Sequence, residues 1–382
     1  MQNYRVHMKK TLLTLALAGL VGSAFANTTV YQSDVARLYV DGYARYVYGY
    51  EKSKVENSNE DTTKGSYARY RFQFGGDFKV ADSTAFGFKV RLQNNFWKDL
   101  TVKNRNLTTD VTTRSHEGEG TQYFAFDRAF VYLSNDNFGR LSLGRQVTVA
   151  DGAASSDLEF LTFDPALQAN FRTSGNKVAY YTSPVFNNFV FEYSYAETKY
   201  NRKVFRITDE RVVQNAFAGT YAFSTGTAVK ATVAFENHRN NGYNTKELKG
   251  YEVAVVQQLG DVSLAAAYDY VRTQNKDGSA QNTVSTDTHH SVVVKGFYNL
   301  NQYFQPYAGV TYQRLDTESN NTKTNVWGGY LGAQSDVYQY DSFKVRVFGE
   351  AVYLHYSTKA NATGDKTTTK APALAAGVKV FF

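Results

Sequence analysis

Hydrophobic and polar residues alternate along many short segments of this chain. In FKVRVFGEAVY, residues 343–353, the odd-numbered positions carry no charge, whereas Lys344, Arg346 and Glu350 occupy even-numbered positions. Alternate side chains of a strand point to opposite faces, so this segment predicts a strand with one apolar side and one polar side. The segments TAVKATVAFE (227–236) and VSLAAAYDY (262–270) repeat the pattern.

Sixteen segments of this kind follow one another. Most of them have the roughly 9–11 residues, or more, that a tilted strand needs to cross a bilayer. The expected ranges are 37–50, 66–80, 84–97, 122–134, 138–147, 175–183, 189–198, 212–223, 226–237, 250–259, 261–272, 290–299, 303–315, 326–337, 342–355 and 372–382.

The connections between these segments also alternate in length. Those after even-numbered segments are short, such as SNDN and GD, and those after odd-numbered segments are long and hydrophilic, such as KDLTVKNRNLTTDVTTRSHEGEG. This layout predicts an all-β fold, a transmembrane antiparallel β-barrel of 16 strands with short periplasmic turns and long extracellular loops. A soluble sandwich or propeller also has short, evenly spaced strands. However, the bulky charges on the polar face need a wet lumen, and no blade-like repeat of about 40–50 residues is present.

The last segment, APALAAGVKVFF, places Val378, Val380 and Phe382 on the apolar side, while Lys379 points the other way. An unpaired edge inside lipid would leave backbone groups without partners. We therefore expect the last strand to close on the first, ARLYVDGYARYVYGY (36–50).

The N-terminus has the features of a secretory signal peptide. Lys9 and Lys10 precede the uncharged run TLLTLALAGLVGSAFA, which ends in a small-x-small cleavage site before Asn27. We expect residues 1–26 to be removed and residues 27–382 to form a single barrel domain in the outer membrane.

Composition and charge argue against a nucleic-acid-binding protein. The chain has 30 tyrosines, 27 phenylalanines and no cysteine, and its mean hydropathy is −0.45. The net charge of +7 includes Arg5, Lys9 and Lys10 of the leader, and the remaining charges form no basic stripe of the kind that a nucleic-acid-binding protein shows.

The histidines give little support to catalysis or metal binding. Most of them lie in expected loops, and His355, near Ser357, shares the outer face with Tyr353. His289 and His290 are adjacent on a strand, so they point to opposite faces and make a poor chelate. No Gly-rich phosphate loop precedes a helix. We expect no enzyme activity, no cofactor and no metal site.

Several stretches resemble the general trimeric porins of Gram-negative outer membranes. They are SYARYRFQFGGDF (66–78), FDRAFVYLSNDNFGRLSLGRQ (126–146), the following VADGAASSDLEF and the terminal Phe382. In such porins the third long loop folds into the barrel, and its acidic residues face basic residues on the wall. The resemblance therefore implies an inward-folded third loop, which here runs from about Thr148 to Ser174.

By position, the residues fit this arrangement. The candidate constriction acids are Asp151, Asp157, Glu159 and Asp164. The candidate basic wall residues are Arg45, Arg69, Arg71, Lys89, Arg91, Arg128, Arg145 and Lys177. Arg145 follows the parity of Leu141 and Leu143, so it reaches the lumen only if Gly144 forms a bulge. The loop carries DLEFLTFDP where the family often has Pro-Glu-Phe-Gly, which leaves open which acid lies at the narrowest point.

These features lead us to expect a porin for passive diffusion of ions and small hydrophilic solutes. A substrate-selective channel for sugars or nucleotides is an alternative, and a surface-binding barrel is a weaker one. The expected partners are two further copies in a homotrimer, outer-membrane lipid and lipopolysaccharide. The resemblance also implies recognition of Phe382 by the barrel-assembly machinery.

Overall fold

The computed structural model describes residues 28–56, 60–98, 125–152, 166–202, 207–240, 243–277, 283–301 and 303–382. The predicted signal peptide, residues 1–26, lies outside these ranges.

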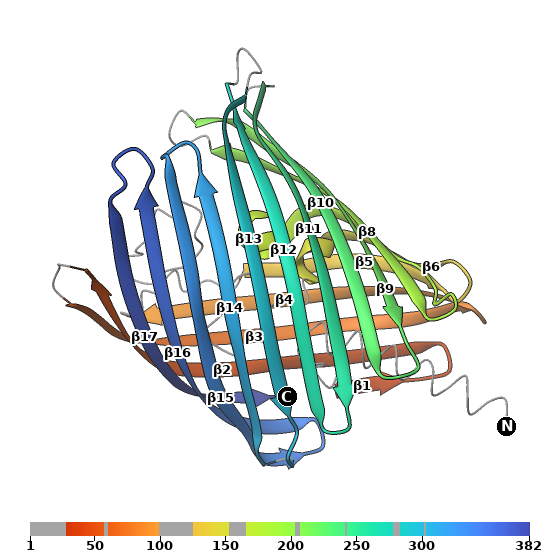
Figure 1. The fold of residues 1–382 in the computed structure, drawn as a ribbon. Helices are drawn as coiled ribbons and strands as arrows, with labels where there is room; N and C mark the ends of the chain where they lie inside the picture. Colours follow the sequence, from red (N-terminus) through yellow and green to blue (C-terminus); the bar gives the residue numbers. More distant parts are fainter. Residues whose placement is uncertain are drawn as a thin grey trace.

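Within them the chain forms seventeen strands and two short helical segments, and Figure 1 shows the strands as one tilted, curved wall. The first nine strands are β1 (Thr28–Gln32), β2 (Ala36–Val55), β3 (Glu60–Ala81), β4 (Thr84–Lys98), β5 (Ala125–Asn135), β6 (Gly139–Val147), β7 (Ser174–Thr182), β8 (Phe189–Arg202) and β9 (Ile207–Ala222). The others are β10 (Thr227–Asn240), β11 (Tyr243–Leu259), β12 (Val262–Lys276), β13 (Thr283–Tyr298), β14 (Gln305–Thr317), β15 (Thr322–Tyr340), β16 (Phe343–Ala360) and β17 (Lys366–Phe381). The helical segments are η1 (Val149–Gly152) and α2 (Ala166–Asn170).

Strands β2 to β17 form the closed barrel. Each pairs antiparallel with the strand before and after it, and β17 pairs with β2. The sixteen predicted segments are therefore confirmed as these sixteen strands. Several extend further toward the long loops than predicted, as β11 does by beginning at Tyr243. Beyond the membrane the strands stay hydrogen-bonded to each other, but their outward residues need not be apolar. The alternation that predicted the membrane-spanning residues is therefore absent there.

The alternation has the direction that a membrane barrel requires. On β10 the outward Val233 and Phe235 are each 40% exposed, whereas the inward Thr232 and Glu236 are each 1% exposed. Apolar side chains thus cover the outside and polar side chains fill the inside, the reverse of a soluble sandwich. No helix in the described part of the chain is long and apolar enough to cross a membrane.

The C-terminus closes the wall. Gly42 N donates to Phe382 O at 2.9 Å and Phe382 N donates to Gly42 O at 3.2 Å. The short strand β1 then pairs with the remaining edge of β2, with Thr28 opposite Val40. The alternation pattern did not predict β1, because five residues are too few to show a period.

The ring of Phe382 lies over Gly42. A Cβ at Gly42 would lie 2.6 Å from ring atoms of Phe382 and 2.5 Å from the carbonyl oxygen of Arg71. At Gly349, a β16 glycine with the same outward parity as the exposed Val347, the nearest atom to an added Cβ is 3.9 Å away. The two glycines therefore form a matched pair for a test of the closure.

We expect Gly42→Ala to destabilise the barrel by about 1–3 kcal/mol, because the added methyl group overpacks the closing strand. Gly349→Ala should be neutral or stabilising by up to about 1 kcal/mol. Urea-unfolding midpoints of the refolded proteins in detergent, followed by heat-modifiable gel mobility, measure the difference. Equal midpoints for the two variants would show that Phe382 does not pack on Gly42.

Candidate functional site

A group of basic side chains lines the inner faces of β2, β3, β4 and β5. Directly opposed positions are Arg45 with Arg69 and Arg91 with Arg128. On β3 the alternate residues Tyr70 and Phe72 are exposed on the outer face, which leaves Arg69 and Arg71 on the inner face. The structure thus brings together six of the predicted wall residues: Arg45, Arg69, Arg71, Lys89, Arg91 and Arg128.

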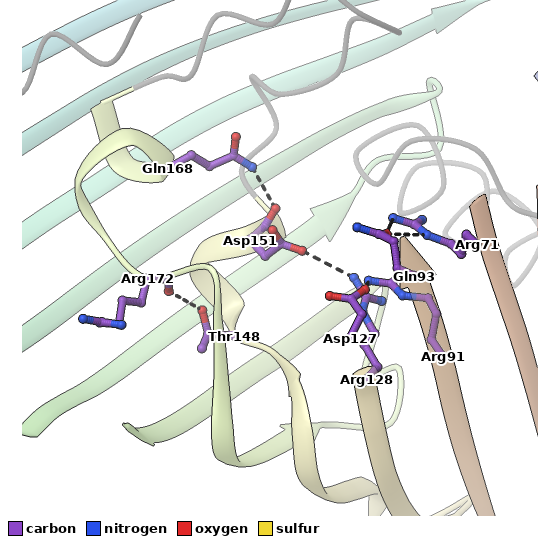
Figure 2. A network of polar contacts seen from close by, with 9 residues as sticks. All are labelled: Arg71, Arg91, Gln93, Asp127, Arg128, Thr148, Asp151, Gln168 and Arg172. Atoms are coloured by element: carbon purple, nitrogen blue, oxygen red, sulfur yellow. Dashed lines mark hydrogen bonds and ion pairs between the residues drawn. The ribbon is translucent and has the colours of Figure 1, made fainter. Parts of the chain in front are cut away.

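A β-bulge in β5 shapes this wall. Arg91 pairs with Arg128 and Leu92 pairs with Phe126, so Asp127 is an extra residue on β5. Phe126 is 58% exposed on the outer face, whereas Asp127 Oδ2 accepts a hydrogen bond from Nη2 of Arg91. The bulge therefore places two consecutive residues, Asp127 and Arg128, on the lumen side (Figure 2).

Neighbouring side chains hold the arginines in place. Nε and Nη2 of Arg71 donate to Oε1 of Gln93 at 3.0 and 2.7 Å. The Arg71 guanidinium lies 4.9 Å from the ring centroid of Tyr43. These contacts fix the direction in which the wall presents its charge.

The loop between β6 and β7 is closed at its neck. Thr148 N donates to Thr173 O at 3.0 Å, and Thr148 Oγ1 donates to Arg172 O at 2.9 Å. Its described parts, residues 148–152 and 166–173, are therefore held side by side at the base of the loop.

These parts of the loop pack against the inner wall on the side of β9 to β12, as Figure 1 shows for the short helical segments. Loop residues and wall residues form one buried apolar cluster: Val149, Ala150, Ala166, Leu167 and Phe171 with Ala216, Ala218, Ala234, Leu248 and Val271. The apolar part of the loop thus replaces water on this side of the interior.

Polar contacts join the loop to the same wall. Val149 N donates to Ser194 Oγ at 2.9 Å, and Ala166 N donates to Ser291 Oγ at 2.8 Å. Arg172 N donates to Oε2 of Glu236 at 2.9 Å. Backbone groups of the loop that would otherwise be buried without partners are satisfied by the wall.

Within the described parts of the loop, Asp151 faces the arginines. Its Oδ2 lies 3.9 Å from Nη2 of Arg128, an ion pair too long for a hydrogen bond (Figure 2). Gln168 Nε2 donates to the carbonyl oxygen of Asp151 at 2.9 Å and ties the two described parts of the loop together. Asp157, Glu159 and Asp164 lie outside the described residues.

Two predicted wall residues lie on the other face. Lys177 pairs with Glu197, on the face of β8 opposite to the buried Ala196 and Thr198. Lys177 is exposed, and its assignment to the lumen is wrong. Its position near the loop end of β7 lets an outward lysine reach polar surroundings.

Arg145 is the second correction. Gly144 has φ 137° and the register shifts beside it, as the bulge hypothesis required. Yet Arg145 is exposed and pairs with Ala129, which follows the inward Arg128. The bulge alters the pairing with β7 and leaves Arg145 on the outward face.

Sequence reasoning missed several residues of this site. Strict alternation on β5 places Asp127 on the face opposite to Arg128, but a carboxylate on a lipid-facing position is itself a signal of a bulge. Gln93 and Gln168 carry no charge and gave no signal. Glu236 was predicted to face inward, but its loop partner, Arg172, is far away in sequence.

No group of three or more His, Asp or Glu side chains in the described ranges is placed to hold a metal ion. The arrangement is instead a lumen wall lined by charged side chains on β2 to β5. The loop lies opposite this wall, with its apolar residues packed against β9 to β12. It can order water and ions by charge, because like-charged side chains along a passage bias which ions pass.

Comparison with known proteins supports the barrel architecture. A family model described as Gram-negative porin matches residues 13–371. A major outer membrane protein of Pasteurella multocida is 24% identical over 192 residues, which are 49% of this chain and 50% of that protein. The chain thus spans about half the length of the curated relatives it matches.

Solved structures share the fold. The trimer form of OmpT of Vibrio cholerae superposes with a TM-score of 0.63 at 16% identity, covering 91% of this chain and 100% of that one. The anion-selective porin from Comamonas acidovorans gives a TM-score of 0.60 at 14% identity, with the same coverage. At these identities the likeness is one of fold.

We expect Glu236→Ala to loosen the loop neck. Glu236 is 1% exposed, and its Oε2 accepts from both Arg172 N and Gln214 Nε2. Loss of this acceptor should speed hydrogen–deuterium exchange in residues 166–173 by about tenfold or more. Glu247→Ala, which breaks the ion pair with Lys276 on β11 and β12, is the control. Unchanged exchange in Glu236→Ala, or the same gain in both variants, would contradict the anchoring role.

Proposed function

The chain belongs to the Gram-negative porin family, and on this premise we propose that it forms a water-filled channel for passive diffusion of ions and small hydrophilic solutes. The observation that carries the proposal is the closed barrel of β2 to β17, with apolar residues outside and charged residues inside. Sixteen strands leave room for an aqueous channel rather than a filled core. As a member of this family, the protein is located in the outer membrane.

The loop of residues 148–173 is proposed to narrow this channel. Asp151 of the loop faces Arg128 of β5. On the other side, the apolar cluster packs the loop against β9 to β12. Asp157, Glu159 and Asp164 are proposed to extend the acidic side of the passage. Charges about 4 Å apart interact by about 4 kcal/mol at an effective dielectric constant near 20, before salt and solvent weaken the interaction.

Family and fold point to a channel rather than an enzyme, and we propose neither a catalytic activity nor a cofactor. Residues 1–26 are proposed to be a cleaved leader, and residues 27–382 the barrel. Outside the barrel the partners are outer-membrane lipid and lipopolysaccharide. Phe382, at the end of the closing strand and 38% exposed, is proposed as the contact for the assembly machinery.

We also propose a homotrimer. The OmpT structure of Vibrio cholerae is described as a trimer form. The outward faces of the early strands carry small residues, including Ala44, Ala68 and Ala129, which permit close approach of another barrel. Gly42 contributes no such surface, because Phe382 of the same chain covers it. Residues 98–121, proposed to reach over a neighbouring subunit, contain only one described residue.

Channel formation is tested directly in planar bilayers. The refolded protein should produce stepwise conductance that rises in proportion to KCl concentration, as expected for ions that cross in water. Protein that is folded by gel mobility but gives no conductance steps would contradict the proposed function.

The constriction is tested with single charge changes. Asp151→Asn should shift the reversal potential in a tenfold KCl gradient toward anions, because Arg128 loses its counter-charge. Arg128→Gln should shift it toward cations. Asp365→Asn, in the exposed connection between β16 and β17, should keep the wild-type value. Shifts of Asp151→Asn and Arg128→Gln in the same direction would contradict the opposed arrangement.

The trimer is tested by mass. Unheated detergent gels should show a band at three times the monomer mass, which heating converts to monomer. Light scattering in mild detergent that finds only single barrels would contradict the trimer.

A further inference from the structure

The inner wall behind α2 carries three neighbouring residues that hold the loop of residues 148–173. Gly250 of β11 is directly opposite Val271 of β12, Asp269 lies two residues away on β12, and Ser291 of β13 is directly opposite Asp269. Directly opposed and diagonal positions of antiparallel strands form one patch on one face of the sheet. We call Gly250, Asp269 and Ser291 the loop seat.

Gly250 provides the hollow of the loop seat. A Cβ at this position would lie 2.6 Å from a ring carbon of Phe171 and 3.0 Å from a methyl carbon of Leu167. Both loop residues are buried there, together with Leu248 and Val271 of the wall. A larger residue at position 250 would therefore push the loop away from the wall, because closely packed side chains leave no room for another methyl group.

Asp269 and Ser291 hold the start of α2. Ala166 N donates to Ser291 Oγ at 2.8 Å, and Ser291 Oγ donates to Asp269 Oδ2 at 3.0 Å. Asp269 and Ser291 are fully buried. Asp269 thus orients the Ser291 hydroxyl so that its oxygen accepts a hydrogen bond from the loop. The loop seat therefore sets both the distance of α2 from the wall and its orientation.

Gln168 connects α2 to the charged side of the interior. Its Nε2 donates to the carbonyl oxygen of Asp151 at 2.9 Å, and Asp151 Oδ2 lies 3.9 Å from Nη2 of Arg128 (Figure 2). Coulomb energy varies with the inverse of distance, so a displacement of about 1 Å changes the energy of a pair at this separation by about a fifth. The strength of the Asp151–Arg128 pair thus depends on where α2 lies.

The loop seat and the arginines lie on opposite sides of the barrel interior. The segment α2 packs on β11, β12 and β13, whereas Arg91 and Arg128 lie on β4 and β5. A loop that is lifted off the loop seat therefore moves toward the arginines and narrows the passage beside them.

We propose that the loop seat determines the ion selectivity of the channel from behind the loop, by fixing the distance between Asp151 and Arg128. Gly250 has no side chain, and Asp269 and Ser291 are fully buried, so the three residues act on ions through the loop. They are positioning residues. The proposal rests on the proposed diffusion channel and gives that channel a control of selectivity that requires no change of lumen charge.

The test compares two glycine variants in planar bilayers. Gly250→Ala adds no charge, yet it should lower single-channel conductance by about a fifth or more, because the lifted loop narrows the passage. It should also shift the reversal potential in a KCl gradient toward cations, because Asp151 moves closer to Arg128. Gly332→Ala is the matched control, since its Cβ would also meet an aromatic ring, but that ring belongs to Tyr307 of β14. The control should match wild type in both measurements.

Further variants test the route through the loop. Phe171→Leu combined with Gly250→Ala should restore the wild-type conductance and reversal potential, because the smaller side chain makes room for the methyl group. In an Asp151→Asn background, Gly250→Ala should cause no further shift of the reversal potential, since the charge that it moves is gone. Asp269→Asn keeps an oxygen that accepts from Ser291 and should retain the wild-type reversal potential.

Each outcome decides the proposal. Wild-type behaviour of Gly250→Ala, or equal changes in Gly332→Ala, would overturn it. A shifted reversal potential in Asp269→Asn, or additive shifts of Gly250→Ala and Asp151→Asn, would also overturn it, because selectivity would then not depend on the position of Asp151.

If Gly250→Ala does not assemble, Ser291→Ala tests the same site. It frees the start of α2 and should shift the reversal potential toward anions, because Asp151 is then held less closely to Arg128; an unchanged value would overturn the proposal. A wild-type protein without conductance would refute the channel itself, which separates that failure from the failure of the loop seat.

Discussion

The structure depends on the pairing of its last strand with its first. Inside a hydrocarbon layer every backbone N–H and C=O group needs a partner within the protein, so a sheet must close. Here β17 pairs with β2 as far as Phe382 and Gly42, and β1 occupies the remaining edge of β2. For a membrane protein built of strands, only a closed sheet satisfies these groups, and closure separates the side chains into a lipid-facing set and a lumen-facing set.

Closure also explains how the interior is divided. The wall of β8 to β13 turns Ser194, Glu236 and Ser291 toward the loop of residues 148–173 and satisfies its backbone. The wall of β2 to β5 keeps its arginines on the opposite side, with Asp151 facing Arg128. The seam itself adds Lys379 and Arg346 to the positive side. The described parts of the loop thus pack on one side of the lumen, and the basic side chains of β2 to β5 lie on the other.

Much of the fold could be predicted from the sequence, because apolar and polar residues must alternate wherever one face of a strand meets lipid and the other meets the lumen. All sixteen barrel strands and the pairing of the last strand with the first were predicted in this way. The failures occur where lipid does not impose the pattern or a bulge breaks it. Lys177 and Arg145 lie near loop ends, where an outward charge is tolerated, and Asp127 sits in a bulge. The contacts of Glu236 join segments distant in sequence, which periodicity does not report.

The most direct measurement of the inward–outward assignment uses introduced cysteines, because the chain has none of its own. Single cysteines at Tyr70, Arg71, Phe126, Asp127, Arg128 and Ala129 would be exposed to a water-soluble, charged thiol reagent in lipid bilayers. We predict modification with a change in conductance at positions 71, 127 and 128, and an unchanged conductance at positions 70, 126 and 129. A change in conductance at 70 equal to that at 71, or an unchanged conductance at 127 beside a reactive 128, would contradict the water-filled lumen or the bulge that shapes its wall.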